Sequence, residues 1–245
     1  MNKQLEIEIS DDYPDGLTWQ KTIATFHPES PEQVADIFHR ANEVKQPVFI
    51  SGFGNNINPV GDKFAEFLVI KSDRLNDIIE INAADFYLTV GSGYPLKEIN
   101  KELAEKNLWF PFADTHYPGS FGGALAAGLA ADDGAQTIPF SKSLLSLTAV
   151  LADGTIVRPG ARACKSVSGY DISRVFYNSW GTMGYIFEMS FRVLPILQKD
   201  NHPHLSIFHP NYGDFKRKFA SNTPPGRECR ALKDEFDPLN TLPII

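Results

Sequence analysis

Apolar and polar positions along the chain predict a mixture of amphipathic helices and short strands. The clearest helix is expected over residues 30–45, where Ser30 can cap the first turn, Pro31 suits its start and Gln33 completes a capping box. Apolar residues then recur at helical spacing, at Val34, Ile37, Phe38 and Ala41. The same spacing predicts a second helix over residues 94–107.

Short apolar runs between and after these helices predict β-strands. The expected strands are residues 48–50, residues 67–71, two runs within residues 75–93 and a final strand after Gly184. Residues 147–160 have the pattern of a β-hairpin with Asp153-Gly154 as its turn. Residues 196–245 are rich in proline and show no clear period, so we interpret them as a tail or small appendage. Trp180 is interpreted as a core aromatic.

Glycine clusters mark the segments that can approach a ligand closely. The first, Gly52-x-Gly54, directly follows an expected strand, and the others lie in residues 119–128 and 181–184. A dinucleotide-binding fold of the Rossmann type is disfavoured, because Ile57 replaces the third glycine of its motif and Asn58-Pro59 prevents a helix from following. Taken alone, each cluster also fits an ordinary turn or a tight packing contact.

Composition and charge narrow the classes of function. The chain has 245 residues, 42% hydrophobic and 22% charged, with a net charge of −7, as expected of a globular protein. No basic stripe suggests a nucleic-acid partner, and no run predicts a signal peptide or a transmembrane segment. Two cysteines outside any metal-binding pattern favour a reducing, cytoplasmic location. With few cations near the glycines, backbone N–H groups are the expected donors to a diphosphate.

Five short segments occur in an order that resembles one flavoprotein family. They are Gly52-x-Gly54, Ser120-Phe121-Gly122-Gly123, Ala152-Asp153-Gly154, residues 165–171 (KSVSGYD) and Gly181-Thr182-Met183-Gly184. This arrangement resembles the FAD-binding domain of the vanillyl-alcohol oxidase and para-cresol methylhydroxylase superfamily. Within it, the chain is most similar to the glycolate oxidase and D-lactate dehydrogenase branch, and above all to the FAD-binding subunit of bacterial glycolate oxidase. The resemblance covers roughly residues 20–195.

The resemblance implies an α+β fold of two lobes with FAD extended between them. On this basis, residues 1–195 are expected to form the FAD-binding domain, with a first lobe of about 20–92 and a second of about 93–195. Residues 196–245 would be a tail or a vestigial cap, because members of the family continue into a much longer cap domain. The chain is therefore expected to have little or no cap.

The resemblance also implies which residues bind FAD. The backbone of Gly52, Phe53, Gly54, Asn55 and Asn56 would hold the pyrophosphate. Pro118, Gly119, Ser120, Gly122 and Gly123 would pass along the ribityl chain and the flavin edge, with Gly128 in the same small-residue cluster. Gly184 to Ile186 would take the adenine end, and Gly169 and Tyr170 would lie near the cofactor.

Two departures from the family pattern bear on this expectation. Phe53 and Asn55 interrupt what is commonly a run of glycines, and the segment 138–141 lacks a glycine that relatives carry. The first glycine loop contains no histidine or cysteine, so FAD is expected to be bound non-covalently. No metal site is expected, although His202 and His204 have the spacing of alternate strand residues.

The implied function is that of an FAD-dependent oxidoreductase acting on CH–OH groups. A 2-hydroxy acid such as glycolate or D-lactate would lose a hydride to the flavin. No catalytic base is assigned, and the missing cap predicts a partner subunit that completes the active site, with association at the membrane surface through that partner. The alternative is a degenerate flavin domain that serves as a structural or binding subunit without catalysis of its own.

Overall fold

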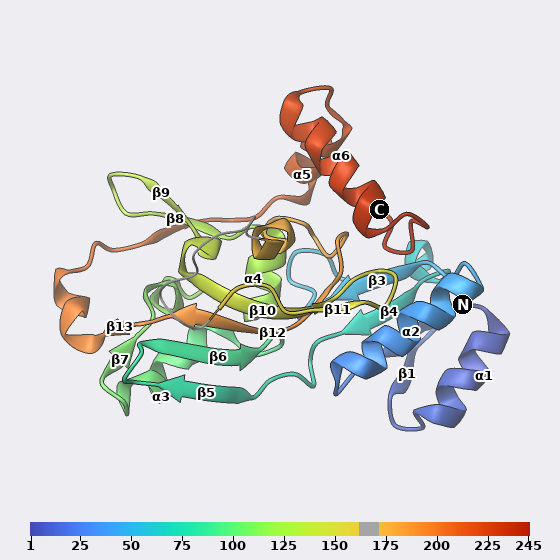
Figure 1. Ribbon diagram of the computed structural model, residues 1–245, viewed down its shortest axis with the longest axis horizontal. Coiled ribbons are helices and arrows are strands. Elements are labelled where there is room, and N and C mark those ends of the chain that lie inside the picture. Colours follow the sequence, from blue (N-terminus) through green and yellow to red (C-terminus); the bar gives the residue numbers. More distant parts are fainter. Residues whose placement is uncertain (162–171) are drawn as a thin grey trace.

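The computed structural model describes residues 1–161 and 172–245. Its strands form two main sheets that lie end to end, one built around the N-terminal region and the other around the middle of the chain (Figure 1). The chain combines helices with one sheet that contains parallel pairs and one antiparallel sheet, so the expected α+β class is confirmed. The larger of two main hydrophobic cores packs on the second sheet, and the other packs on the first sheet together with Val150 and Tyr185 of the second.

The first sheet has the strand order β1-β2-β4-β3, with β2, β4 and β3 parallel to one another. These strands are β1 (Leu17–Gln20), β2 (Ile23–Phe26), β3 (Val48–Ser51) and β4 (Leu68–Lys71). Two helices accompany them, α1 (Lys3–Asp12) and α2 (Pro31–Glu43). The apolar residues expected on one face of α2 are all buried, and the Ser30 hydroxyl caps the helix by accepting from the N–H of Gln33. That helix is confirmed, whereas α1 has no counterpart among the expected elements.

The second sheet is antiparallel and has the order β11-β10-β12-β6-β5. Its strands are β5 (Ile78–Asn82), β6 (Tyr87–Gly91), β10 (Leu144–Val150), β11 (Ile156–Val157) and β12 (Tyr185–Arg192). The short helix α4 (Phe121–Ala127) packs against β12 and β6 and buries its apolar side in the larger of the two cores. The hairpin expected at 147–160 is present, and Gly154 adopts the left-handed conformation in its turn.

Smaller elements complete the second half of the chain. Strand β7 (Leu108–Trp109) pairs with β13 (Leu194–Pro195), and β8 (Ala130–Asp132) lies between β9 (Thr137–Pro139) and β14 (Ser206–Phe208). The 3-10 helices cover Asp62–Phe64, Leu96–Glu98, Pro111–Thr115, Phe140–Ser143, Ile172–Phe176 and Ile196–Asn201. The helix expected over 94–107 is shorter than predicted, because it begins as a 3-10 turn after Pro95 and continues as α3 (Ile99–Ala104).

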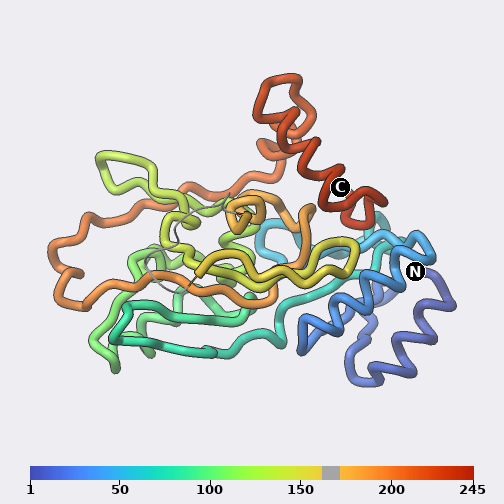
Figure 2. The backbone as a smooth tube through the Cα atoms, in the orientation of Figure 1, coloured from blue at the N-terminus to red at the C-terminus, as the bar shows by residue number. Residues whose placement is uncertain are grey.

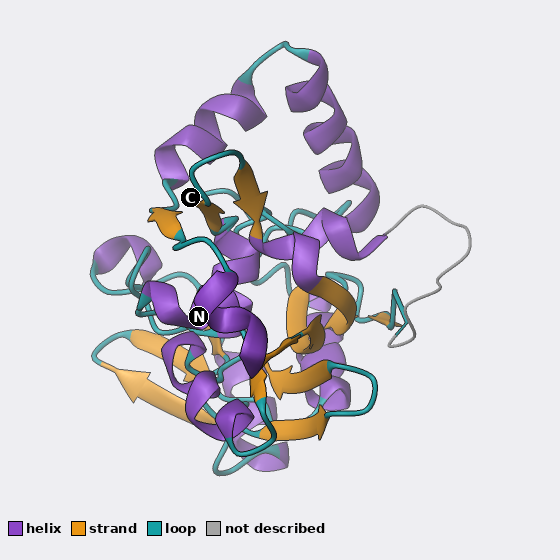
Figure 3. Ribbon diagram, turned by 90° about the vertical axis from the view of Figure 1, so that its left-hand side faces the viewer, coloured by secondary structure: helices purple, strands orange, loops and turns teal. Residues whose placement is uncertain are grey.

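The proline-rich segment after residue 196 contains two helices that the sequence pattern did not predict. They are α5 (Tyr212–Ala220) and α6 (Pro224–Phe236), which stand above the sheets in Figures 1 and 3. Pro224 and Pro225 occupy the first turn of α6, a position where proline needs no hydrogen-bond partner. The chain then returns to the first sheet (Figure 2), where the Thr241 carbonyl accepts a hydrogen bond from the Val48 N–H at 2.7 Å.

The division of the chain into domains stays a prediction. We note that β5 and β6 pair within the second sheet, so strand pairing passes from one sheet to the other between residue 71 and residue 78. Among the helices in the described ranges, none is long and apolar enough to cross a membrane.

Candidate functional site

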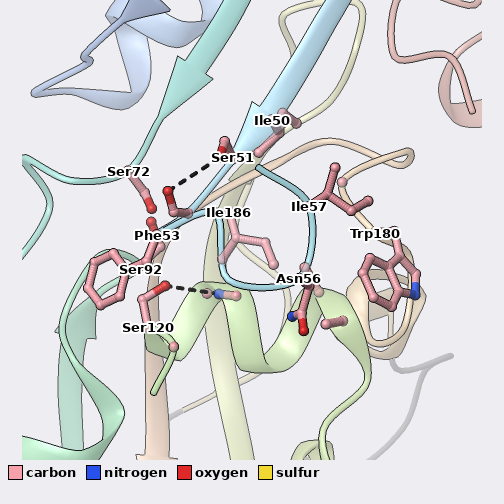
Figure 4. Close-up of a pocket in the computed structure, with 18 of the residues that line it drawn as sticks. Ile50, Ser51, Phe53, Asn56, Ile57, Ser72, Ser92, Ser120, Trp180 and Ile186 are labelled. Atoms are coloured by element: carbon pink, nitrogen blue, oxygen red, sulfur yellow. Dashed lines mark hydrogen bonds between the residues drawn. The ribbon is translucent and has the colours of Figure 1, made fainter. Parts of the chain in front are cut away.

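A pocket lies where the carboxyl end of β3 meets the amino end of α4 and the turn before β12 (Figure 4). Three parts of the chain line it. The first part is residues 49–57 with Ser72 and Ser92, the second is Tyr117, Gly119, Ser120, Gly122, Gly123, Ala126 and Ala127, and the third is Trp180, Gly181, Gly184, Tyr185 and Ile186. Both halves of the molecule therefore contribute to one pocket.

The loop that follows β3 presents a row of free backbone donors. The last ladder bond at this end of β3 is accepted by the Ser51 carbonyl from the N–H of Ser72, at 3.2 Å. For residues 53–57, no acceptor of the backbone N–H groups is found within the described structure. Gly54 has a φ of 78°, a left-handed conformation that a residue without a side chain adopts at no cost. Successive free N–H groups around such a turn form an anion-binding concavity.

Serine hydroxyls lie at the Gly52 end of this loop. A Cβ added to Gly52 would lie 3.3 Å from the Ser120 Oγ and 3.9 Å from the Ser72 Oγ, so these two hydroxyls flank the glycine. The Ser92 Oγ is buried and has no hydrogen-bond partner among the described residues. Tyr185 lies near it, but the geometry falls short of a hydrogen bond, and the Tyr185 hydroxyl donates to the Lys71 carbonyl at 3.2 Å. A buried hydroxyl without a partner is costly unless something else pairs with it.

The first turn of α4 shapes the pocket through close packing. The N–H of Phe121 donates to the Tyr94 carbonyl, that of Gly122 to the Ser92 carbonyl and that of Gly123 to the Ser120 hydroxyl. These three N–H groups therefore already have acceptors within the protein. A Cβ on Gly122 would come within 2.7 Å of the Ser92 Cβ, which explains why only glycine fits this approach.

Two asparagine side chains tie the loop to the facing segment. The amide of Asn55 donates to the Pro118 carbonyl, and that of Asn56 donates to the Tyr117 hydroxyl, both at 3.0 Å. The residue that interrupts the glycines, Phe53, is 42% exposed, and Figure 4 shows its ring on the side of Ser92 and Ser120. The loop is thus held at its far end while the Phe53 ring remains open to solvent.

Most of the residues predicted to bind the cofactor come together in this pocket. Those that line it are Gly52, Phe53, Gly54, Asn55, Asn56, Gly119, Ser120, Gly122, Gly123, Gly184 and Ile186. Pro118 and Gly128 are not among the lining residues, and Gly128 instead ends α4 against Asn178. Gly169 and Tyr170 lie outside the described residues. What the lining residues bind stays a prediction.

Several lining residues were not predicted. Ser51, Ser72 and Ser92 stand at or directly after the carboxyl ends of β3, β4 and β6, and a small polar residue at such a position is the signal that could have found them. Trp180 was expected in the core, but it is half-buried and lines the pocket. Its local sequence gives no sign of this, because its position depends on contacts with the C-terminal helices.

The pocket is electrically neutral in the part of the chain that the structure describes. Its lining there contains no Asp, Glu, Lys, Arg, His or Cys. Burial raises the pKa of Tyr117, and burial raises that of Tyr185 further, so both phenols keep their protons at neutral pH. The arrangement can bind an anion through neutral donors, but none of these described side chains can act as a base. No described cluster of three or more His, Cys, Asp or Glu could hold a metal ion.

Known proteins resemble this chain in sequence and in fold. The model of the FAD binding domain family matches residues 22–160. An uncharacterized FAD-linked oxidoreductase of Mycobacterium tuberculosis is 27% identical over 206 residues, covering 82% of this chain and 43% of that protein. The D-lactate dehydrogenase of Archaeoglobus fulgidus is 28% identical over 69% of this chain and 38% of its own length. Glycolate oxidase subunit GlcD of Bacillus subtilis is 25% identical over 70% of this chain and 37% of its own length.

A solved structure of alkyldihydroxyacetonephosphate synthase superposes with a TM-score of 0.65. At 17% identity it covers 80% of this chain and 41% of the synthase, so the two proteins share a fold. The chain thus spans less than half the length of these relatives. The family match covers the loop after β3 and the first turn of α4, so the resemblance inferred from the motifs is confirmed. The chain belongs to the FAD binding domain family, and FAD is its cofactor.

Proposed function

We propose that the protein is the FAD-binding component of an oxidoreductase that oxidises a 2-hydroxy acid of the glycolate or D-lactate type. The observation that carries the proposal is the row of free N–H groups at residues 53–57, beside serine hydroxyls in a neutral pocket. The names of two relatives, a D-lactate dehydrogenase and a glycolate oxidase subunit, support the substrate class.

The residues of the pocket fit the pyrophosphate of FAD. The free N–H groups of the loop would hold it, while Ser72, Ser92 and Ser120 would donate from the other side. The first turn of α4 would lie along the ribityl chain and the flavin edge, where its glycines leave room for close contact. Gly184 and Ile186 would lie at the adenine end.

When bound, the flavin supplies an acceptor for a hydride from the hydroxyl-bearing carbon. Proton removal from the hydroxyl needs a base, and the described pocket residues offer none. We therefore propose that a partner subunit, or protein beyond this chain, supplies the base and the substrate pocket. The glycolate oxidase relative, named as a subunit, supports this assembly. We place the protein in the cytoplasm, where it would reach a membrane surface only through its partner.

An absorption spectrum of the purified protein with added FAD tests the proposal. We expect stoichiometric binding with flavin bands near those of other flavoproteins, and anaerobic bleaching by glycolate or D-lactate once the partner is present. Bound FAD that no hydroxy acid reduces in the complete assembly would favour the non-catalytic alternative. A protein that takes up no FAD would refute the proposal itself.

Substitution of Ser92 by alanine should change binding and stability in opposite directions. The buried Ser92 hydroxyl has no partner among the described residues, so its loss should leave the melting temperature unchanged or slightly raised. A hydrogen bond to a charged phosphate contributes about 1.5–3 kcal/mol, so FAD binding should weaken about tenfold or more. Calorimetric titration and thermal unfolding measure the two effects.

Ser190→Ala is the matched control for this prediction. Its hydroxyl is equally buried, at 2% exposure, but it pairs with the Thr89 hydroxyl at 2.8 Å outside the pocket. Stability should fall by about 1 kcal/mol with no change in FAD affinity. If Ser92→Ala behaved like Ser190→Ala, the Ser92 hydroxyl would have no role in binding.

A further inference from the structure

Trp180 stands in a turn whose backbone is held in an unusual conformation. Its φ is 54°, and Asn178 and Gly181 also have positive φ, at 56° and 77°. A left-handed conformation is rare for a bulky residue and persists only where the surrounding structure enforces it. Here the Trp180 N–H donates to the Ala126 carbonyl at 2.8 Å, and the Asn178 N–H donates to the Leu125 carbonyl at 3.1 Å. The turn is thereby fastened to α4.

This turn presents the indole to one end of the pocket. The indole N–H donates to the side chain of Asn178 at 3.0 Å, so its polar atom is satisfied within the turn. Figure 4 shows Trp180 beside Ile57, across the pocket from Ser72 and Ser92. The pocket therefore has serine hydroxyls toward one end and the Trp180 indole with Ile57 toward the other, as a ligand with a charged group and a planar ring requires.

Helix α5 supports the indole from behind. The ring centroids of Trp180 and Tyr212 are 5.1 Å apart at 58°, and Phe215 follows at 6.4 Å. The Tyr212 hydroxyl in turn accepts a hydrogen bond from the N–H of Ile245 at 2.9 Å. Both the turn and its support lie beyond residues 22–160, the part that matches the FAD binding domain family.

We propose that Trp180 is a stacking surface for a planar ring of the bound dinucleotide, and that Tyr212 is a positioning residue that holds it in place. This inference rests on the proposed binding of FAD in this pocket. The group that Trp180 would bind is a flat aromatic heterocycle, which stacks on indole through dispersion and through the quadrupole of the ring. FAD offers two such rings, adenine and isoalloxazine.

Two substitutions of Trp180 test the stacking. Trp180→Gly removes the ring and accepts the positive φ without strain, so the turn should survive, which thermal unfolding checks. We expect the Kd for FAD to rise about tenfold in Trp180→Gly and less than about threefold in Trp180→Phe, which keeps an aromatic face. Equal affinity of Trp180→Gly and wild type would overturn the inference. Wild-type protein that binds no FAD would instead refute the proposed function.

Competition by ADP and by FMN against FAD identifies the ring. If Trp180 stacks on adenine, Trp180→Gly should weaken competition by ADP about tenfold and leave competition by FMN unchanged; stacking on isoalloxazine gives the reverse. An equal loss for both competitors would indicate general damage to the pocket and would contradict stacking.

The role of Tyr212 is tested against a neighbour on the same helix. Tyr212→Ala should weaken FAD binding and shift the fluorescence contributed by Trp180, taken as the difference from the matching Trp180→Phe protein. Tyr212→Phe keeps the ring and should restore both. Phe219→Ala is the control, because its ring packs on Phe215, at 6.1 Å, rather than on Trp180. Indistinguishable results for Tyr212→Ala and Phe219→Ala would show that Tyr212 does not position Trp180.

Discussion

Gly54→Asp should abolish the retention of FAD while the protein stays folded. A Cβ at this position would meet its nearest atom, in Asn58, at 3.5 Å, which is ordinary contact, so the loop has room for a side chain. The new carboxylate would face the proposed pyrophosphate. Like charges about 4 Å apart repel by about 4 kcal/mol at an effective dielectric constant near 20. We expect the Kd for FAD to rise by about 100-fold or more.

Two further variants control for the position of the new side chain and for its charge. Gly61 also has a positive φ, 89°, but a Cβ there would meet nothing within 4 Å, and it does not line the pocket. Gly61→Asp therefore introduces the same backbone strain and the same charge outside the pocket, so FAD content should be unchanged. Gly54→Asn, which tolerates a left-handed backbone and is neutral, should fall between the two. A folded Gly54→Asp protein with its full complement of flavin would show that this loop does not hold the pyrophosphate.

The parts of the fold that depend on local pattern could be predicted from the sequence. Helix α2 was predictable because its cap, its first-turn proline and its apolar face all lie within residues 30–43. The loop after β3 was predictable for a similar reason. Its two glycines stand directly after a run of buried residues, so the strand and the turn that follows it are encoded together. That this turn binds an anion stays a prediction.

The parts that depend on distant contacts could not be predicted in this way. Ser92 resembles any polar residue after a strand until its hydroxyl is seen buried beside Tyr185, more than ninety residues away. Trp180 resembles a core aromatic until α5 is placed behind it. Helix α6 begins with two prolines, which suggest an irregular tail unless the helix start that accommodates them is known.

A buried ion pair fastens the end of the chain to the rest of the molecule. Lys233 in α6 and Asp237, 5% and 3% exposed, pair with each other, and Lys233 also donates to the Leu242 carbonyl at 2.8 Å. Asp237 further accepts from the N–H groups of Thr241 and Leu242, each at 2.8 Å. Thr241 in turn bonds to β3, the strand that leads into the loop with the free N–H groups. The pair thus connects α6 to the strand beneath the pocket.

Asp237→Asn should destabilise the protein by about 3–5 kcal/mol, because it leaves the Lys233 ammonium buried without its counter-charge. Burial already lowers the pKa of Lys233 in the native protein, and Asp237 opposes that shift. Lys233 therefore binds fewer protons in the folded state than in the unfolded chain as pH rises toward the usual lysine value, so its contribution to stability should increase with pH in that range. Without Asp237 the pKa of Lys233 falls further, so the increase in its contribution to stability should begin closer to neutral pH. Urea unfolding at a series of pH values measures both effects.

Two further variants separate the buried charge from the loss of a hydrogen bond. Lys233→Met in the Asp237→Asn background removes the unpaired ammonium. It should recover part of the lost stability and remove the contribution of Lys233 to the pH dependence. Asp214→Asn breaks the exposed pair with Arg217 on α5 and should cost less than about 1 kcal/mol. Similar small losses for Asp237→Asn and Asp214→Asn would mean that the C-terminal helices are not fastened by this pair. A large loss confined to Asp237→Asn would show that this pair secures the segment that supports Trp180.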